Sequence, residues 1–256
     1  MTEPSLGGMS ERRMRAIILA AGRGSRLGLL TSQRPKCLAE IRGVSLLARQ
    51  IGALREAGIN EIAVVTGYRN DMLAPFGLRE FHNAEWAMTN MVYSLLHASP
   101  WLVTGDCIVS YGDIFYRKSA VSSLMETRAD VALTYDPDWL SLWSMRADNP
   151  LTDAETFRLR PDGTISEIGG KPGSVSEVEG QYMGLLKLTP AGWIQILRVA
   201  QVMGLNFHDI SMTGMLQQLI VNQLLRVRGV EYKDGWGEVD TETDLALYET
   251  SGPEWL

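Results

Sequence analysis

The sequence predicts an α/β domain, and three features support this fold class. Residues 16–21 and 62–65 are short, unbroken apolar runs, the pattern of strands that are buried on both faces of a parallel sheet. Residues 44–57 lie between them and carry apolar side chains at helical spacing up to Gly58, a typical residue after a helix. A helix that connects two such strands makes them parallel, with a right-handed crossover. We therefore expect a Rossmann-like, mixed but mainly parallel sheet flanked by helices.

The composition fits one domain. The 256 residues are 45% hydrophobic, which is enough for one sizeable core, and no change in composition divides the chain. The first residues are polar and contain no hydrophobic signal segment, so we expect residues 1–14 to be a flexible extension and residues 15–256 to form the domain. No apolar run reaches the roughly 18 residues of a membrane span, so we expect a cytoplasmic protein without a membrane partner.

The net charge argues against a nucleic-acid-binding protein, and the cysteines argue against a zinc or disulfide-rich protein. A formal net charge of −6 disfavours a nucleic-acid partner, which usually requires a basic face. Cys37 and Cys107 are far from C-x-x-C spacing, so neither a zinc site nor a disulfide framework is expected. The sequence leaves open whether the protein is a monomer or a homodimer.

A glycine-containing loop follows the first strand. Gly22 and Gly24 free the backbone to bring its N–H groups close to a polyphosphate. Basic residues gather in and after this loop, in a chain that is acidic as a whole: Arg23, Arg26, Arg34 and Lys36. The loop is therefore expected to bind an anion, although an exposed turn without a ligand is an alternative.

Two other glycine motifs do not fit this loop. The dinucleotide fingerprint requires G-x-G-x-x-G and an acidic residue after the second strand, but here the third glycine is displaced to Gly28 and the second strand ends in Thr66-Gly67. The P-loop requires Gly-Lys followed by Ser or Thr, and Gly170-Lys171 is followed by Pro172. A nicotinamide, flavin or P-loop site is not expected.

Residues 19–27, Leu-Ala-Ala-Gly-Arg-Gly-Ser-Arg-Leu, and residues 34–38, Arg-Pro-Lys-Cys-Leu, resemble the signature of the nucleotidyltransferase family. This family makes activated sugars and activated choline from a nucleoside triphosphate and a phosphate acceptor. The resemblance covers most of the chain from Arg15 to Tyr248. It implies that the loop wraps the triphosphate, that Arg26 grips the β and γ phosphates, and that Lys36 neutralises charge at the reacting centre. The nucleotide-binding residues that it implies in the loop are Leu19, Ala20, Ala21, Gly22, Arg23, Gly24 and Ser25.

The next elements lead to a second polar segment. We expect a short helix at residues 71–76, a strand at residues 80–82, and a helix that begins after Asn90. On propensity alone, Asn90 is only a helix cap. An Asn before Tyr-Ser-Leu, however, resembles the phosphocholine and phosphonate cytidylyltransferase branch of the family, which implies CTP as the nucleotide. Thr89, Asn90 and Ser94 are then expected to contact the cytosine edge or the ribose, where small polar groups are needed.

Two aspartates lie far apart in the chain. Residues 107–113 form an apolar run that ends in Asp113, and ligands of open α/β sheets bind at the carboxyl ends of strands. Asp240 directly precedes a helix that is expected to end near Tyr248. Taken alone, Asp113 is equally explained as a turn residue after Gly112. The family resemblance implies that Asp113 and Asp240 hold Mg²⁺, which proteins usually bind with one or two carboxylates plus phosphates and water.

The remaining elements complete the predicted fold. A strand is expected at residues 131–136, a hairpin at residues 156–159 and 165–168, and a further strand at residues 181–188. These segments predict a small antiparallel lobe within about residues 135–190. Helices at residues 191–202 and 209–222 and a strand at residues 224–230 follow.

The lobe is expected to bind the acceptor. Its aromatic faces and carboxylates suit a small cation better than a sugar. The residues concerned are Tyr135, Asp136, Trp139, Glu179 and Tyr182. Residues 179–186 also resemble the phosphonate cytidylyltransferases, so 2-aminoethylphosphonate or a close phosphonate is the expected acceptor, with phosphocholine second. The alternative is that Trp139 and Trp143, four residues apart, only pack one helical face against the core.

Two other functions remain open. One is a non-catalytic nucleotide-binding sensor, against which the joint presence of Lys36, Asp113 and Asp240 argues. The other is a sugar-1-phosphate nucleotidyltransferase that uses UTP or dTTP. The segment from Glu167 to Pro172 resembles the Glu-Lys-Pro of those enzymes only with an insertion, which argues against it.

Overall fold

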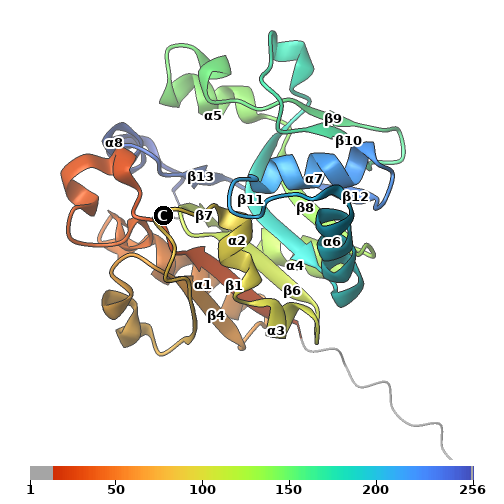
Figure 1. The fold of residues 1–256 in the computed structure, drawn as a ribbon. Coiled ribbons are helices and arrows are strands. Elements are labelled where there is room, and N and C mark those ends of the chain that lie inside the picture. The colour runs from red at the N-terminus through yellow and green to blue at the C-terminus, as the bar shows by residue number, and fades with distance from the viewer. Residues whose placement is uncertain (1–13, 255) are drawn as a thin grey trace, which may run out of the picture.

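A seven-stranded sheet runs through the centre of the structure, a computed structural model that describes residues 14–254 and 256 (Figure 1). The strand order is β12-β8-β11-β6-β1-β4-β5. The strands of this sheet are β1 (Arg15–Ala20), β4 (Ile62–Thr66), β5 (Arg79–His82), β6 (Cys107–Tyr111), β8 (Val131–Asp136), β11 (Gln181–Leu188) and β12 (Val227–Glu231). Only β11 runs against its neighbours β6 and β8, whereas all other neighbouring strands are parallel. The predicted mixed, mainly parallel sheet is confirmed.

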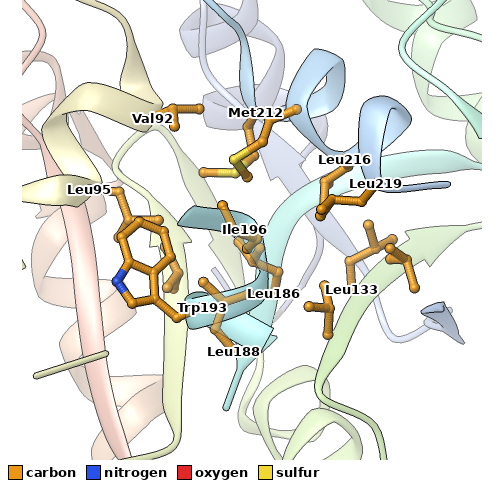
Figure 2. Close-up of a cluster of buried hydrophobic side chains, with 14 of the residues drawn as sticks. Val92, Leu95, Leu133, Leu186, Leu188, Trp193, Ile196, Met212, Leu216 and Leu219 are labelled. Carbon is orange, nitrogen blue, oxygen red and sulfur yellow. The ribbon is translucent and has the colours of Figure 1, made fainter. Parts of the chain in front are cut away.

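Helices cover both faces of the sheet. They are α1 (Leu46–Glu56), α2 (Met91–Leu96), α3 (Ser99–Leu102), α4 (Lys118–Glu126), α5 (Trp139–Arg146), α6 (Pro190–Met203), α7 (Met212–Val221) and α8 (Glu242–Ser251). Side chains of β1 alternate between two cores, as a strand requires: Ile17 and Leu19 face one cluster, and Ile18 faces the other. Figure 2 shows the first cluster, in which α2, α6 and α7 pack against β8 and β11.

Three small antiparallel sheets complete the fold. They are formed by β2 (Glu40–Ile41) with β3 (Val44–Ser45), β7 (Ile114–Tyr116) with β13 (Trp236–Glu238), and β9 (Phe157–Leu159) with β10 (Ile165–Ile168). The β9–β10 hairpin is the one predicted, and in Figure 1 it lies with α5 at the top of the molecule. Residues 181–188, which the sequence placed with the lobe, form β11 in the central sheet. Single turns of 3-10 helix occur elsewhere, and longer 3-10 segments lie at Ser25–Thr31 and Asn70–Phe76.

Several predicted boundaries shift because of caps and turns. The helix predicted at residues 209–222 begins only at Met212, since the Ser211 hydroxyl accepts the Gly214 N–H as its cap. The strand predicted at residues 224–230 is β12, which starts at Val227. Most of the predicted extension lies outside the described residues; Met14, which is described, packs partly buried against the core. None of the described helices is long and apolar enough to cross a membrane.

Candidate active site

A cavity of about 240 Å³ opens at the carboxyl ends of β1 and β6. These strands pair in parallel with Leu19 beside Tyr111, so the segments that follow them leave the sheet at the same edge. That edge is where open α/β sheets bind ligands. The predicted site residues that line the cavity are Leu19, Ala20, Ala21, Gly22, Gly24, Lys36, Thr89, Asn90, Ser94 and Asp113.

The loop after β1 is shaped around the side chain of Lys36. Gly24 has a φ of 75°, a left-handed conformation that favours glycine. A Cβ atom at this position would lie 2.6 Å from Lys36 Cβ, so a larger residue would displace the lysine. The Thr31 hydroxyl donates to the Gly24 carbonyl at 2.8 Å and closes the loop. At Gly22, by contrast, a Cβ would meet no atom within 4 Å, because this residue faces the open cavity.

The basic residues of the loop have different partners. Arg26 Nη2 donates to Asp240 Oδ1 at 2.9 Å, which ties the loop to the far end of the chain. The Arg23 guanidinium lies 5.7 Å from the centre of the Tyr68 ring, and Arg34 pairs with Glu40 at 3.8 Å. Arg23, Ser25 and Arg26 are exposed. Of the predicted cations, Lys36 is the one that lines the cavity.

Lys36 lies between two carboxylates. Its Nζ donates to Asp113 Oδ2 at 2.8 Å and also to Asp240 Oδ1. Burial alone would lower the pKa of Lys36, but the negative charges of Asp113 and Asp240 outweigh burial and hold that pKa above its ordinary value. Lys36 is therefore a permanent positive charge at the edge of the cavity.

Three carboxylates meet beside Lys36. One oxygen each of Asp113, Glu238 and Asp240 lies within 4.8 Å of the others. Asp113 Oδ1 is buried and has no hydrogen-bond partner among the described residues, so it is free to ligate a cation. Burial, together with the charges of Asp240 and Asp113, raises the pKa of Glu238 well above its ordinary value. A cation bound here would relieve this repulsion, and a set of carboxylate oxygens suits Mg²⁺.

The pairing of β7 with β13 brings these carboxylates together. β7 follows directly after Asp113, and its Ile114 pairs with Glu238. The Val239 N–H donates to the Asp113 carbonyl at 2.9 Å, which fixes the register next to the site. Glu238 was not among the predicted site residues. The signal was the spacing Glu238-Val239-Asp240, because alternate residues of an extended segment point to the same face.

Arg146 of α5 holds the acidic side of the site in place. Its Nε donates to Asp244 Oδ1 at 2.9 Å, and its Nη atoms lie 3.5 Å from Glu238 Oε2 and 3.7 Å from Asp240 Oδ2. The side chain is only 5% exposed and its guanidinium lies 4.7 Å from the centre of the Trp143 ring. Asp244 also accepts the N–H groups of Asp240 and Thr241 at 2.9 Å each. Arg146 therefore orients the segment that carries Asp240.

Replacing Arg146 by methionine is expected to lower the free energy of unfolding by about 2 to 3 kcal/mol, because buried carboxylates lose their cation. Urea unfolding followed by circular dichroism measures this change. As a control, Arg55→Met removes an exposed arginine of α1 and should change the same free energy by less than about 0.5 kcal/mol. Equal stability of Arg146→Met and the wild type would contradict the assigned role.

The other side of the cavity is formed by α2 and the turn before it. Thr89, Asn90 and Ser94 all line the cavity, together with the indole of Trp86. The Asn90 side chain accepts the Met91 N–H at 2.7 Å and donates to the Asp209 carbonyl at 3.3 Å. Asn90 is thus the predicted helix cap, and it also ties α2 to the segment before α7.

Most residues predicted to bind the acceptor lie away from this cavity. Asp136 accepts hydrogen bonds from Trp236 Nε1 at 2.9 Å and from the Asp138 N–H at 2.8 Å, and it lines a separate cavity of about 320 Å³. Trp139 is 2% exposed, and its Nε1 donates to the Val178 carbonyl. Tyr135 packs against Phe157, and Glu179 accepts the Leu159 N–H. Among these residues only Tyr182 adjoins the cavity, because its ring lies 5.6 Å from that of Tyr111, which lines it.

Two further acidic residues flank the site and were not predicted. Glu155 accepts a hydrogen bond from the Thr213 hydroxyl at 3.1 Å. Burial raises the pKa of both Tyr111 and Tyr182, and the charge of Glu155 adds to this effect. Burial and the nearby Asp153 raise the pKa of Glu155 itself. The signal in the sequence that could have marked them is the stretch from Asp148 to Glu155, which resembles the phosphonate cytidylyltransferases. Glu155 and Tyr182 lie close to Tyr111, so the three form an acidic, aromatic wall of which only Tyr111 lines the cavity next to Asp113.

Comparisons with known proteins agree on one family. Residues 16–158 match the MobA-like NTP transferase domain. The chain is 37% identical to CTP:phosphoglutamine cytidylyltransferase of Campylobacter jejuni, over 91% of this chain and 98% of that protein. It is 30% identical to 2-aminoethylphosphonate cytidylyltransferase of Lancefieldella rimae over 42% of this chain and 46% of that protein. The solved structure of CTP:phosphocholine cytidylyltransferase from Streptococcus pneumoniae superimposes with a TM-score of 0.69 and 24% identity, covering 93% of this chain and 98% of that chain, which shows a shared fold.

Proposed function

This chain belongs to the MobA-like NTP transferase family, and we propose that it is a cytidylyltransferase that joins CMP, from CTP, to a small phosphonate or phosphorylated acceptor. The observation that carries this proposal is the buried Lys36 cation held beside Asp113, Glu238 and Asp240 at the mouth of the cavity. Pyrophosphate is the other product. The cytidylyltransferase names of the relatives support CTP as the nucleotide.

The loop after β1 is proposed to hold the triphosphate. Gly22 leaves the cavity side of the loop open, so backbone N–H groups can approach phosphate oxygens. Arg26 is exposed on this loop and can reach the β and γ phosphates, while Lys36 stands deeper, next to the carboxylates. We propose that, in this order, the α-phosphorus lies near Lys36.

Mg²⁺ is proposed to bind between Asp113, Glu238 and Asp240, because three carboxylate oxygens and the free Asp113 Oδ1 fit its preference for oxygen ligands. When bound, the ion would neutralise charge on the triphosphate and the leaving pyrophosphate. Arg146 keeps Glu238 and Asp240 in place for this role.

The chain's own residues act by charge and position. The acceptor is already an anion at neutral pH, so its oxygen needs no general base, and no residue has to form a covalent intermediate. The obstacle is repulsion between this anion and the triphosphate. Lys36 reduces that repulsion at the reacting phosphorus, and the fixed loop holds the triphosphate in position for in-line displacement.

We propose an acceptor that carries an amine, 2-aminoethylphosphonate before phosphocholine. The wall formed by Glu155, Tyr111 and Tyr182 supplies a carboxylate and aromatic rings beside the reacting centre, the combination that attracts an ammonium group. Glu155 takes the role that the sequence suggested for Asp136, whose two oxygens are occupied by Trp236 and Asp138. The relative that matches along the whole chain is named for phosphoglutamine, so this compound belongs in the same test.

The test measures pyrophosphate release from CTP and Mg²⁺ with 2-aminoethylphosphonate, 2-hydroxyethylphosphonate, phosphocholine, phosphoglutamine and a hexose 1-phosphate. We expect turnover with an amine-bearing acceptor and about tenfold higher kcat/KM for the amine than for the hydroxyl compound. Glu155→Gln should remove that advantage, whereas the control Asp136→Asn should keep it. Tight CTP binding without turnover across the panel would instead indicate a sensor. Preference for a hexose 1-phosphate with UTP or dTTP would indicate a sugar nucleotidyltransferase.

A further inference from the structure

We infer that Asn83 sets the hydrogen bonds that the base pocket offers, so that Thr89 presents only an acceptor and Ser94 keeps a hydrogen to donate, which favours cytosine over uracil. This inference rests on the proposed use of CTP. Asn83 is a positioning residue that is not proposed to touch the base. It acts through the hydroxyl groups of Thr89 and Ser94, which line the cavity.

The orientation of the Asn83 amide is determined by a backbone group. Asn83 is fully buried directly after β5, and its own N–H donates to the Thr66 carbonyl at 2.8 Å. Its Oδ1 accepts the Glu85 N–H at 2.9 Å. Because a backbone N–H can only donate, the oxygen of the amide must face Glu85, and the nitrogen must face the other way.

Both hydrogens of the Asn83 nitrogen are then directed at hydroxyl groups. Nδ2 donates to Thr89 Oγ1 at 3.0 Å and to Ser94 Oγ at 3.0 Å. Thr89 uses its own hydrogen on the Glu85 carbonyl at 2.9 Å, so it keeps only a lone pair for a ligand. The hydroxyl hydrogen of Ser94 has no acceptor within residues 14–254, so it is free to be donated into the cavity.

This pattern matches one pyrimidine. Cytosine presents an amino group, which donates, next to the ring nitrogen N3, which accepts. Uracil presents the reverse, a carbonyl oxygen next to an N3–H group. A lone pair on Thr89 and the hydrogen of Ser94 therefore pair with cytosine, while uracil would set its carbonyl oxygen against the Thr89 lone pair. Hydroxyl groups normally rotate to suit either base, but Thr89 accepts from Asn83 and donates to the Glu85 carbonyl, so it cannot turn its hydrogen toward uracil without losing that bond.

The test compares kcat/KM for CTP and UTP in the wild type, Asn83→Asp and Ser94→Ala. Aspartate has the shape of asparagine and still accepts the Glu85 N–H, but it offers at most one hydrogen in place of two, so the Ser94 hydroxyl turns its hydrogen toward residue 83. We expect the CTP-to-UTP ratio to fall at least about tenfold in Asn83→Asp. Ser94→Ala should lower kcat/KM for CTP by about tenfold, more than it lowers the value for UTP.

The control is Asn149→Asp, which adds the same charge at a turn outside the cavity and keeps the bond from the Leu151 N–H. The CTP-to-UTP ratio of kcat/KM in Asn149→Asp should equal that of the wild type. An unchanged ratio in folded Asn83→Asp, with the wild type preferring CTP, overturns this inference and leaves the proposed function intact. If Asn83→Asp does not fold, an unchanged CTP-to-UTP ratio in Ser94→Ala overturns the inference instead. A wild-type enzyme that prefers UTP or another nucleotide contradicts the proposed function and this inference together.

Discussion

Replacing Lys36 by alanine should lower kcat by about 10² to 10³-fold and leave the protein folded. The loss corresponds to about 3 to 4 kcal/mol of transition-state stabilisation, the usual effect of removing one fixed charge partner from a reacting centre. Lys36 is suited to this role because Asp113 and Asp240 hold its Nζ in one position and keep it charged. Initial rates of pyrophosphate release at saturating CTP and acceptor give kcat, and circular dichroism checks the fold.

Two further variants separate charge from position. Lys36→Arg keeps the charge but not the compact ammonium group, so it should recover only part of the rate. Lys118→Ala removes an exposed lysine at the start of α4 and should turn over like the wild type. Near-normal kcat in folded Lys36→Ala would show that Lys36 is not part of the reacting centre.

Removing one carboxylate of the cluster is expected to have the second large effect. Asp113→Asn, Glu238→Gln and Asp240→Asn should each lower kcat/KM by about 10² to 10³-fold and raise the Mg²⁺ concentration that gives half of the maximal rate. Asn and Gln keep the shape of the side chain, so the change isolates the loss of charge. Asp71→Asn, an exposed residue paired with Arg69, is the matched control.

The Mg²⁺ titration distinguishes a ligand from a residue that only supports the fold. A variant that loses activity but keeps the wild-type Mg²⁺ dependence would not be a metal ligand. Glu238→Gln is the most informative of the three, because the sequence patterns alone did not single out this residue. If Glu238→Gln responds to Mg²⁺ as the wild type does, the proposed Mg²⁺ site would consist of Asp113 and Asp240 alone.

Helices and strands were well predicted where one continuous segment carries a clear hydrophobic or capping pattern. Residues 181–188 form β11 with the predicted bounds, and the capping role of Asn90 is confirmed. Helices α4 and α5 were not predicted, and neither were several short segments. β7 and β13 have three residues each and are stable only because they pair with each other, a contact between segments about 120 positions apart that local patterns do not report. That pair is what brings Glu238 to Asp113.

The residues proposed to bind the acceptor were the least predictable part of the site. Asp136 ends a strand at the same edge of the sheet as Asp113, which is what the sequence indicated. However, β11 lies between β6 and β8, so Asp136 is separated from β6 by two strand spacings, roughly 10 Å. Because β11 is antiparallel, its first residues return to this edge, and Tyr182 comes next to Tyr111. The order of the strands in the sheet decides which side chains lie next to each other, and short sequence patterns do not reveal that order.

The most direct measurement of the central claim follows the phosphorus atoms of CTP. The wild-type protein is incubated with Mg²⁺, the preferred acceptor of the panel and CTP labelled at either the α or the γ phosphate, and the products are separated. We expect the α label to appear in a product that joins CMP to the acceptor, and the γ label to appear in pyrophosphate. Transfer of the γ label to the acceptor, or retention of both labels in bound CTP, would contradict nucleotidyl transfer.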